Sequence, residues 1–280
     1  MTAWIIALAI GALGWWINAR LAHGASSDSR TVSLAIPVIF GVTIIAMWQV
    51  LVTMLDVSAV ILPAPSAIAS RFVNSIPILF ADFVQTIIKG ALTGFIIGMV
   101  AAFVVAVIAD RSPFLTKGIL PVGSFMAALP IVGTAPIFVK WYGSDWESKA
   151  AVVAVMVFFP ILVNTVAGLR DTTAMQRDLM RTYAADYWTT LFKLRLPAAL
   201  PFIFNGLKIA TTLALIGAIV AEFFGSPTVG MGFRISTSVG QLAMDMVWAE
   251  IVVAALAGSS FYGAIALLEK RVTFWHPSQR

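Results

Sequence analysis

Long apolar runs recur through this chain and constrain its fold more than any other feature. The clearest lie at 34–54, 83–109, 150–168, 205–224 and 247–268. Each is about as long as, or longer than, the roughly 20 residues that an α-helix needs to cross the hydrocarbon core of a bilayer. The chain is 60% hydrophobic and 11% charged, whereas soluble domains carry about 25% charged residues. We therefore expect an all-α fold, a polytopic membrane helix bundle.

Two further apolar segments are less regular. Residues 118–139 are interrupted by three prolines, which a membrane helix tolerates where protein or a cavity satisfies the freed carbonyls. Residues 3–18 are short for a span. We favour a membrane helix there over a cleaved signal or an interfacial anchor, because no basic segment precedes it. The prediction is six core transmembrane helices plus an extra N-terminal helix.

The basic residues set the expected topology. A polar loop at 170–204 separates two of the spans, and placing it in the cytoplasm puts most Lys and Arg residues on that side. The net charge of +5 therefore reflects membrane orientation, and we expect no nucleic acid partner. We divide the chain into an N-terminal helix and polar link at 1–33, a transmembrane domain at 34–272 that includes the loop, and a tail at 273–280.

One glycine pattern predicts close helix packing. Gly90, Gly94 and Gly98 are spaced by four within the span at 83–109, which makes a stripe where another helix can approach closely. We favour packing within the chain over a contact between two copies.

Residue types that carry chemistry are scarce. The sequence has no cysteine, and its two histidines, His23 and His276, stand outside the apolar spans. It contains no G-x-x-x-x-G-K-[ST] motif, so we expect no nucleotide site. A membrane-embedded enzyme needs a cluster of catalytic side chains in or beside the spans, and none stands out. We expect no catalytic residue, no metal and no cofactor bound by this chain.

The polar loop has helical periodicity. Apolar residues recur at spacings of three and four, which predicts a helix–turn–helix lying under the membrane. These residues are Met175, Leu179, Met180, Tyr183, Tyr187, Trp188, Leu191 and Phe192. Charged residues, Arg177, Asp178 and Arg181, fall on the other face. Pro197 and Pro201 end the loop and begin the next span.

The loop resembles the cytoplasmic coupling motif of binding-protein-dependent ABC-importer permeases. That motif reads Glu-Ala-Ala, three residues, Gly, nine residues, Ile, one residue, Leu-Pro. Counting back from Leu196 and Pro197 places Asp178 at the glutamate and Ala184 at the glycine. Leu-Pro is the identical part, and the departures are Asp178, Leu179, Met180, Ala184 and Leu194.

Other segments extend the resemblance over about residues 45–270. They are similar to elements of the nitrate, sulfonate and taurine permease group, in the same order, and read ILPAPSAI, ALPIVGTAPIFVKWYG, FFPILVNTVAGLR and LPAALPFIFNGLKIA. Two more, ALIGAIVAEFFG and GMGFRI, resemble permeases for pyrimidine-type precursors.

The resemblance implies the membrane permease subunit of an importer in the bacterial inner membrane. It implies a path for a small polar solute, either a nitrate-, sulfonate- or taurine-like anion or a pyrimidine-type precursor. The implied partners are ABC ATPase subunits that bind ATP and Mg, an extracytoplasmic substrate-binding protein, a second permease copy in a homodimer, and membrane lipid. The alternative is an ATP-independent secondary transporter or channel, which favours paired intramembrane charges or an inverted repeat. We find neither pattern.

The resemblance also implies a set of coupling residues. We expect Tyr183, Ala184, Ala185 and Trp188 to be buried against the ATPase. Arg177, Asp178 and Arg181 would form the charged rim, and Leu196 and Pro197 end the motif.

Three polar residues near or within the spans are candidates for the translocation path. Glu222 is a carboxylate at the end of an otherwise apolar span, and ionisable groups at membrane depth are often functional. The alternative, which we favour, is a hydrated position at the outer interface without a role in the path. Asn164 and Asn205 either line a path or hydrogen-bond across helices, and we favour the hydrogen bond.

Overall fold

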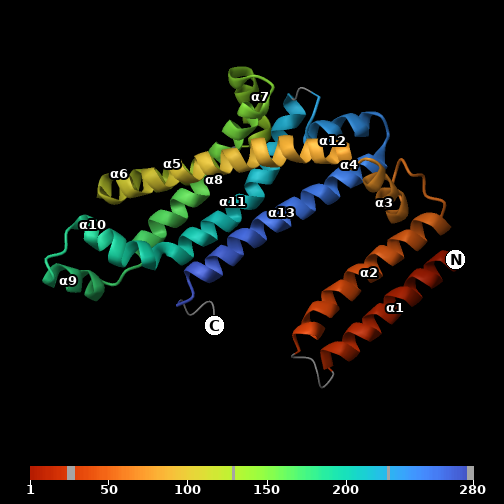
Figure 1. The fold of residues 1–280 in the computed structure, drawn as a ribbon, viewed down its shortest axis with the longest axis horizontal. Coiled ribbons are helices and arrows are strands. Elements are labelled where there is room, and N and C mark those ends of the chain that lie inside the picture. The colour runs from red at the N-terminus through yellow and green to blue at the C-terminus, as the bar shows by residue number, and fades with distance from the viewer. Residues whose placement is uncertain (24–28, 128–129, 226–227, 276–280) are drawn as a thin grey trace. The chain divides into compact units, whose positions relative to one another are not determined.

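The computed structural model describes residues 1–23, 29–127, 130–225 and 228–275 (Figure 1). Among these residues, six helices are long and apolar enough to cross a membrane, at 2–23, 31–54, 76–110, 146–170, 187–224 and 244–272. All five of the clearest predicted runs lie inside one of these helices. The polytopic all-α fold is therefore confirmed, and the N-terminal segment forms a helix of spanning length.

The elements follow one another without a β-strand in the described part of the chain. They are α1 (Thr2–His23), α2 (Arg30–Met54), α3 (Pro65–Asn74), α4 (Ile76–Phe83), the π-helix η1 (Val84–Leu92), α5 (Thr93–Asp110), α6 (Pro113–Ala127), α7 (Ile131–Tyr142), α8 (Trp146–Arg170), α9 (Ala174–Thr182), α10 (Tyr187–Thr190), the π-helix η2 (Leu191–Arg195), α11 (Leu196–Phe224), α12 (Met231–Gly240) and α13 (Met244–Val272).

The structure differs from the expectation at 118–139. Two shorter helices, α6 and α7, replace the single span, so the described residues hold six span-length helices and not seven. Pro130 is the N-cap of α7 and has an extended backbone, with φ −69° and ψ 114°. Proline lacks an N–H and disfavours helical geometry in the residue before it. The break at this proline is therefore the physical reason for two helices.

The chain forms two units. Unit 1 is Met1–Ile76 with Thr237–Glu250, and unit 2 is Pro77–Ser236 with Ile251–Arg280. In unit 1, α1 packs on α2 through small residues, of which Ala3, Ala7 and Gly14 are buried. A Cβ added at Gly14 would lie 2.6 Å from the Thr43 methyl carbon. Small residues that let two backbones approach this closely are typical of helix association in membranes.

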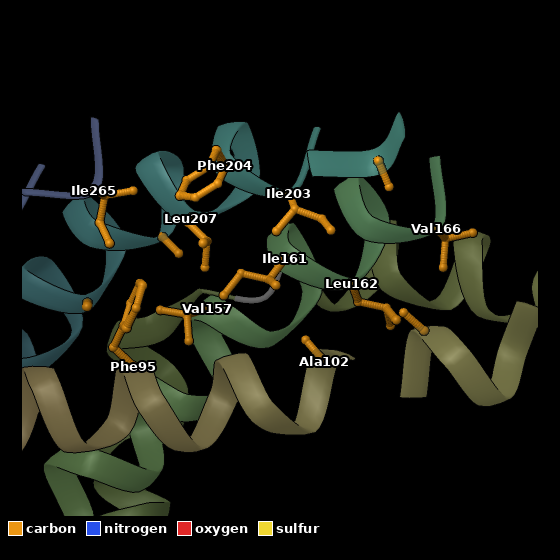
Figure 2. Packing of buried hydrophobic residues seen from close by; sticks show 14 of the residues in the cluster. Phe95, Ala102, Val157, Ile161, Leu162, Val166, Ile203, Phe204, Leu207 and Ile265 are labelled. Atoms are coloured by element: carbon orange, nitrogen blue, oxygen red, sulfur yellow. The ribbon is translucent and has the colours of Figure 1, made fainter. Parts of the chain in front are cut away.

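In unit 2, α8 packs between α5 and α11 (Figure 1). Side chains from these three helices and from α13 form the core, shown in Figure 2: Phe95, Ala102, Val157, Ile161, Leu162, Val166, Ile203, Phe204, Leu207 and Ile265. The glycine stripe of η1 and α5 faces α8. A Cβ at Gly94 would lie 2.6 Å from the Val153 Cβ, and one at Gly98 would lie 2.5 Å from the Ala154 carbonyl oxygen. Packing of the stripe within the chain is confirmed.

Candidate functional site

The first candidate region is the loop after α8, which is expected to face the cytoplasm. Its helix, α9, begins at a capping box. The Thr173 hydroxyl accepts from the Gln176 N–H at 3.2 Å, and the Gln176 side chain accepts from the Thr173 N–H at 2.9 Å. Arg177 bonds back to Thr172, through both the carbonyl and the hydroxyl oxygen. The predicted helix in this loop is confirmed.

The predicted charged rim is solvated. Asp178 and Arg181 form an ion pair at 3.2 Å with side chains that are 66% and 82% exposed. A pair so exposed contributes at most about 1 kcal/mol to stability. Both side chains are therefore free to interact with another molecule at little expense to the fold.

The turn after α9 is a Schellman motif. The Ala185 N–H donates to the Met180 carbonyl at 3.0 Å, and the Ala184 N–H donates to the Arg181 carbonyl at 2.9 Å. Ala184 has φ +52°, in the left-handed region that favours glycine. This is the position at which the sequence resemblance places the glycine of the coupling motif, and the backbone there has the conformation that glycine favours.

Replacing Ala184 with glycine is expected to stabilise the chain slightly. A left-handed conformation costs an L-residue roughly 1–2 kcal/mol, whereas glycine loses about 0.5–1 kcal/mol more through its flexible unfolded state. The net gain is thus up to about 1.5 kcal/mol, measured as a raised unfolding temperature in detergent. Ala185→Gly is the matched control, because Ala185 lacks a positive φ and gains nothing; equal shifts in both variants would contradict the strained turn.

An apolar ridge runs along the outside of α9. Met175, Leu179 and Tyr183, spaced by four, are 82%, 55% and 76% exposed, and α9, which is described in full, has no buried residue. Beside the ridge lies an open groove of ≈ 490 Å³ lined by Met180, Tyr183, Ala184, Ala185, Asp186, Thr189 and Lys193. Exposed apolar surface of this kind marks an interaction site.

Trp188, another predicted coupling residue, does not line that groove. It stacks on Phe192, with ring centroids 6.0 Å apart, and the Arg111 guanidinium lies 4.5 Å from its ring. The structure thus brings Tyr183, Ala184 and Ala185 together and places Trp188 on a neighbouring surface. Nearly half of the Trp188 side chain is exposed, at 46%.

The segment from α10 to α11 is continuous with a membrane helix. Asp186 caps α10 by accepting from the Thr189 N–H at 3.0 Å, and hydrogen bonds from Thr189 hold the pKa of Asp186 below its usual value. The π-helix η2 follows, in which the Leu196 N–H donates to the Leu191 carbonyl. Leu196 and Pro197 then open α11, where a proline without an N–H is tolerated.

A buried carboxylate that sequence reasoning missed holds this segment. Asp110, at the end of α5, accepts from Arg195 Nη1 at 2.7 Å and Nη2 at 2.5 Å, and from the Tyr187 hydroxyl at 3.0 Å. Arg195 Nε donates to the Leu169 carbonyl of α8 at 2.9 Å. Arg111 lies 4.6 Å from the Tyr187 ring centroid. The sequence signal that could have identified Asp110 is its position as an acidic residue directly after the apolar run 83–109.

The second candidate region contains the predicted path residues. Asn205 Nδ2 donates to Asn164 Oδ1 at 3.1 Å, and Asn164 Nδ2 donates to the Pro160 carbonyl at 2.8 Å. The favoured hydrogen bond between α8 and α11 is thus confirmed. Asn205 is nevertheless exposed. Near Pro160, a cavity of ≈ 280 Å³ among α7, α8 and α11 is lined by Thr134, Phe138, Met156, Phe159 and Leu213, among others.

Glu222 lies in a buried polar cluster at the other end of α11. Its side chain is 2% exposed and accepts from the Thr86 hydroxyl at 2.8 Å and from the Gly232 N–H at 2.7 Å. A Cβ at Gly230 would lie within 2.7 Å of the Glu222 carboxylate, and φ at Gly230 is +132°. Glycine is therefore required at position 230 for the backbone before α12 to pass over the Glu222 carboxylate.

Sequence reasoning missed the rest of the cluster. Asp82 is fully buried and accepts from the Gly230 N–H at 2.6 Å and from Arg234 Nε at 2.8 Å. The Met231 N–H donates to the Thr86 hydroxyl at 2.8 Å. The two carboxylates thus lie beneath the first turn of α12, where a helix N-terminus favours negative charge. The cluster joins α4, η1 and α11 to the start of α12.

Known proteins resemble this chain in sequence. Residues 94–274 match the family model described as binding-protein-dependent transport system inner membrane component. A putative aliphatic sulfonates transport permease protein of Bacillus subtilis is 31% identical over 237 residues, 84% of this chain and 85% of the relative. A formylaminopyrimidine transport permease protein of Halalkalibacterium halodurans is 28% identical, over 87% of this chain and 96% of the relative. The taurine transport system permease protein of Escherichia coli is 26% identical, over 89% and 91%.

Proposed function

The chain belongs to the family of binding-protein-dependent transport system inner membrane components, and from this premise we propose that it couples ATP hydrolysis on a partner to solute import. It is a multi-pass protein of the inner membrane and a transport component, not an enzyme. One observation carries the proposal beyond the family: the exposed apolar ridge of α9 beside the groove at Tyr183–Ala185. This surface lies where the coupling motif falls in the sequence.

The ridge is the proposed contact with an ABC ATPase subunit. An amphipathic helix binds a groove on its partner through apolar anchors spaced by three and four, and Met175, Leu179 and Tyr183 have this spacing. Small side chains at Ala184 and Ala185 allow close approach, and Asp178 and Arg181 form a solvated rim. ATP and Mg would be bound by the ATPase and not by this chain.

The path is proposed to run along the exposed face of α11 at Asn205. A polar side chain exposed within an apolar span faces a partner or a water-filled path more readily than lipid. The Asn164–Asn205 pair and the nearby cavity support this placement. A second copy of the chain would complete the path, an extracytoplasmic binding protein would deliver the solute, and Glu222 would help to close the outer end.

The solute is proposed to be small and polar. The relatives are named for aliphatic sulfonates, taurine and formylaminopyrimidine. A sulfonate-like anion or a pyrimidine ring would be recognised mainly by the binding protein.

Co-purification tests this function. The chain is co-expressed with the ATPase and binding protein encoded beside it, and the complex is placed in nanodiscs. We expect a stable complex whose ATPase rate rises with loaded binding protein, and no rise when the Walker lysine of the ATPase is replaced. A chain that purifies alone and takes up solute with an ion gradient would instead be a secondary transporter.

A further inference from the structure

Three membrane helices of unit 2 meet at one ion pair. The Asp110 side chain, 4% exposed, ends α5 and receives both guanidinium Nη atoms of Arg195, which lies just before α11. The third guanidinium nitrogen of Arg195 reaches the Leu169 carbonyl at the end of α8. Figure 1 shows α9 and α10 at this same end of the unit, where α5 leads into α6. The loop that bears the apolar ridge thus begins and ends at this junction.

Stability alone gives little reason for a charged pair here. A carboxylate at the C-terminal end of a helix opposes the helix dipole. Removing two charges from water offsets most of their attraction, so a buried ion pair is weak evidence for stability. A bidentate arginine–carboxylate pair does fix a direction, because two parallel hydrogen bonds define the plane of both groups. Its distinctive contribution is therefore geometric.

We propose that Asp110 and Arg195 are a positioning pair that transmits movement of the coupling loop to α5 and α8. The inference rests on the proposed function, because it assumes that an ATPase moves α9. Arg195 is joined to α11 through the backbone, to α5 through Asp110 and to α8 through Leu169. Tyr187 adds a second bond from the loop to Asp110 at 3.0 Å. The three helix ends then move with the loop as one body.

The rest of the loop offers a reason why such a pair is needed. All of α9 is described, and none of its residues is buried, so its own packing cannot transmit a displacement. Without the pair, a push on α9 would be absorbed by bending at η2, because helices bend sharply at π-bulges. ATP hydrolysis would then proceed without matching movement of the path.

The test separates coupling from folding. Asp110→Asn keeps the size of the side chain and removes its charge. In nanodiscs with the ATPase and binding protein, we expect an assembled complex, ATP hydrolysis within about twofold of wild type, and at least tenfold less solute transported per ATP hydrolysed. The exchange Asp110→Arg with Arg195→Asp restores the pair in reverse and is expected to recover part of the coupling.

The control is Asp245→Asn, which removes a half-exposed ion pair with Arg71 at 3.2 Å in unit 1 and is expected to leave transport per ATP unchanged. Tyr187→Phe is a milder second variant, in case Asp110→Asn folds poorly. In both variants, ATP hydrolysis and transport could fall together, in proportion to the loss of folded protein. That result would mean that the pair is structural, and it would overturn the proposal. Normal transport per ATP in Asp110→Asn overturns it too. Failure of the wild-type chain to bind the ATPase would instead contradict the proposed function.

Discussion

Replacing Ala185 with arginine is expected to abolish ATP-driven uptake and leave the chain folded in the membrane. Ala185 lines the groove beside the apolar ridge, and its part in the fold is a backbone hydrogen bond to Met180, which arginine retains. At the proposed interface the new side chain would fill the groove and bury an unpaired charge. Such a charge costs several kcal/mol, and about 1.4 kcal/mol is a factor of ten in affinity. We expect at least a 100-fold loss of uptake in proteoliposomes.

The matched control for this variant is Ala174→Arg. Ala174 is exposed at the first turn of α9 and does not line the groove, so the same chemical change should leave more than half of the uptake. Membrane-inserted protein is quantified for both variants by size-exclusion chromatography. Wild-type uptake with Ala185→Arg would remove the groove from the ATPase contact.

Replacing Gly98 with leucine is expected to prevent folded protein from accumulating. A Cβ at this position would already lie 2.5 Å from the Ala154 carbonyl oxygen and 3.0 Å from its Cα atom. Both are backbone atoms of α8, so no side-chain rotation relieves the overlap and the two helices must separate. Overpacking usually costs about 1–3 kcal/mol, and we expect the upper end or more. The measurement is the yield and unfolding temperature of detergent-solubilised protein.

Gly263→Leu provides the comparison for Gly98→Leu. Gly263 lies within α13, and a Cβ added there would have no neighbouring atom within 4 Å. Leucine is also the better helix former by up to about 1 kcal/mol, so this variant should fold at least as well as wild type. Equal yields of the two variants would mean that α5 does not pack on α8 through this stripe.

Much of the fold could be predicted from the sequence, because span length and periodicity are local properties. The run at 205–224 predicted the membrane part of α11, and the spacing of Met175, Leu179 and Tyr183 predicted α9. The break near Pro130 could not be predicted. A proline can bend a membrane helix or end it, and the outcome depends on which neighbours satisfy the freed carbonyl groups.

In the candidate site, too, local patterns could be predicted from the sequence and long-range contacts could not. Counting from Leu196 and Pro197 found Ala184, because the motif is a local pattern that fixes a turn. Asp110 and Arg195 are 85 positions apart, and no local pattern indicates that they meet. Glu222 was recognised as unusual for its place in an apolar span, but its partner Thr86 lies 136 positions away. Long-range pairs of this kind depend on how the helices pack.

The π-helix η2 sets the direction in which the loop at 170–204 faces around the axis of α11. Successive residues of an α-helix are rotated by about 100°, so Tyr187 and Arg195, eight positions apart, would point roughly 80° away from each other in a straight α-helix. A π-turn accommodates one extra residue and brings the two side chains to within roughly 20° of each other, so that both reach Asp110. The π-turn therefore absorbs the extra residue, and it is the π hydrogen bonding of η2 that determines which way the loop faces. Removing one residue of η2 would leave Tyr187 and Arg195 seven positions apart in a plain α-helix, again within roughly 20° of each other, so the loop is expected to keep its direction without the π-turn.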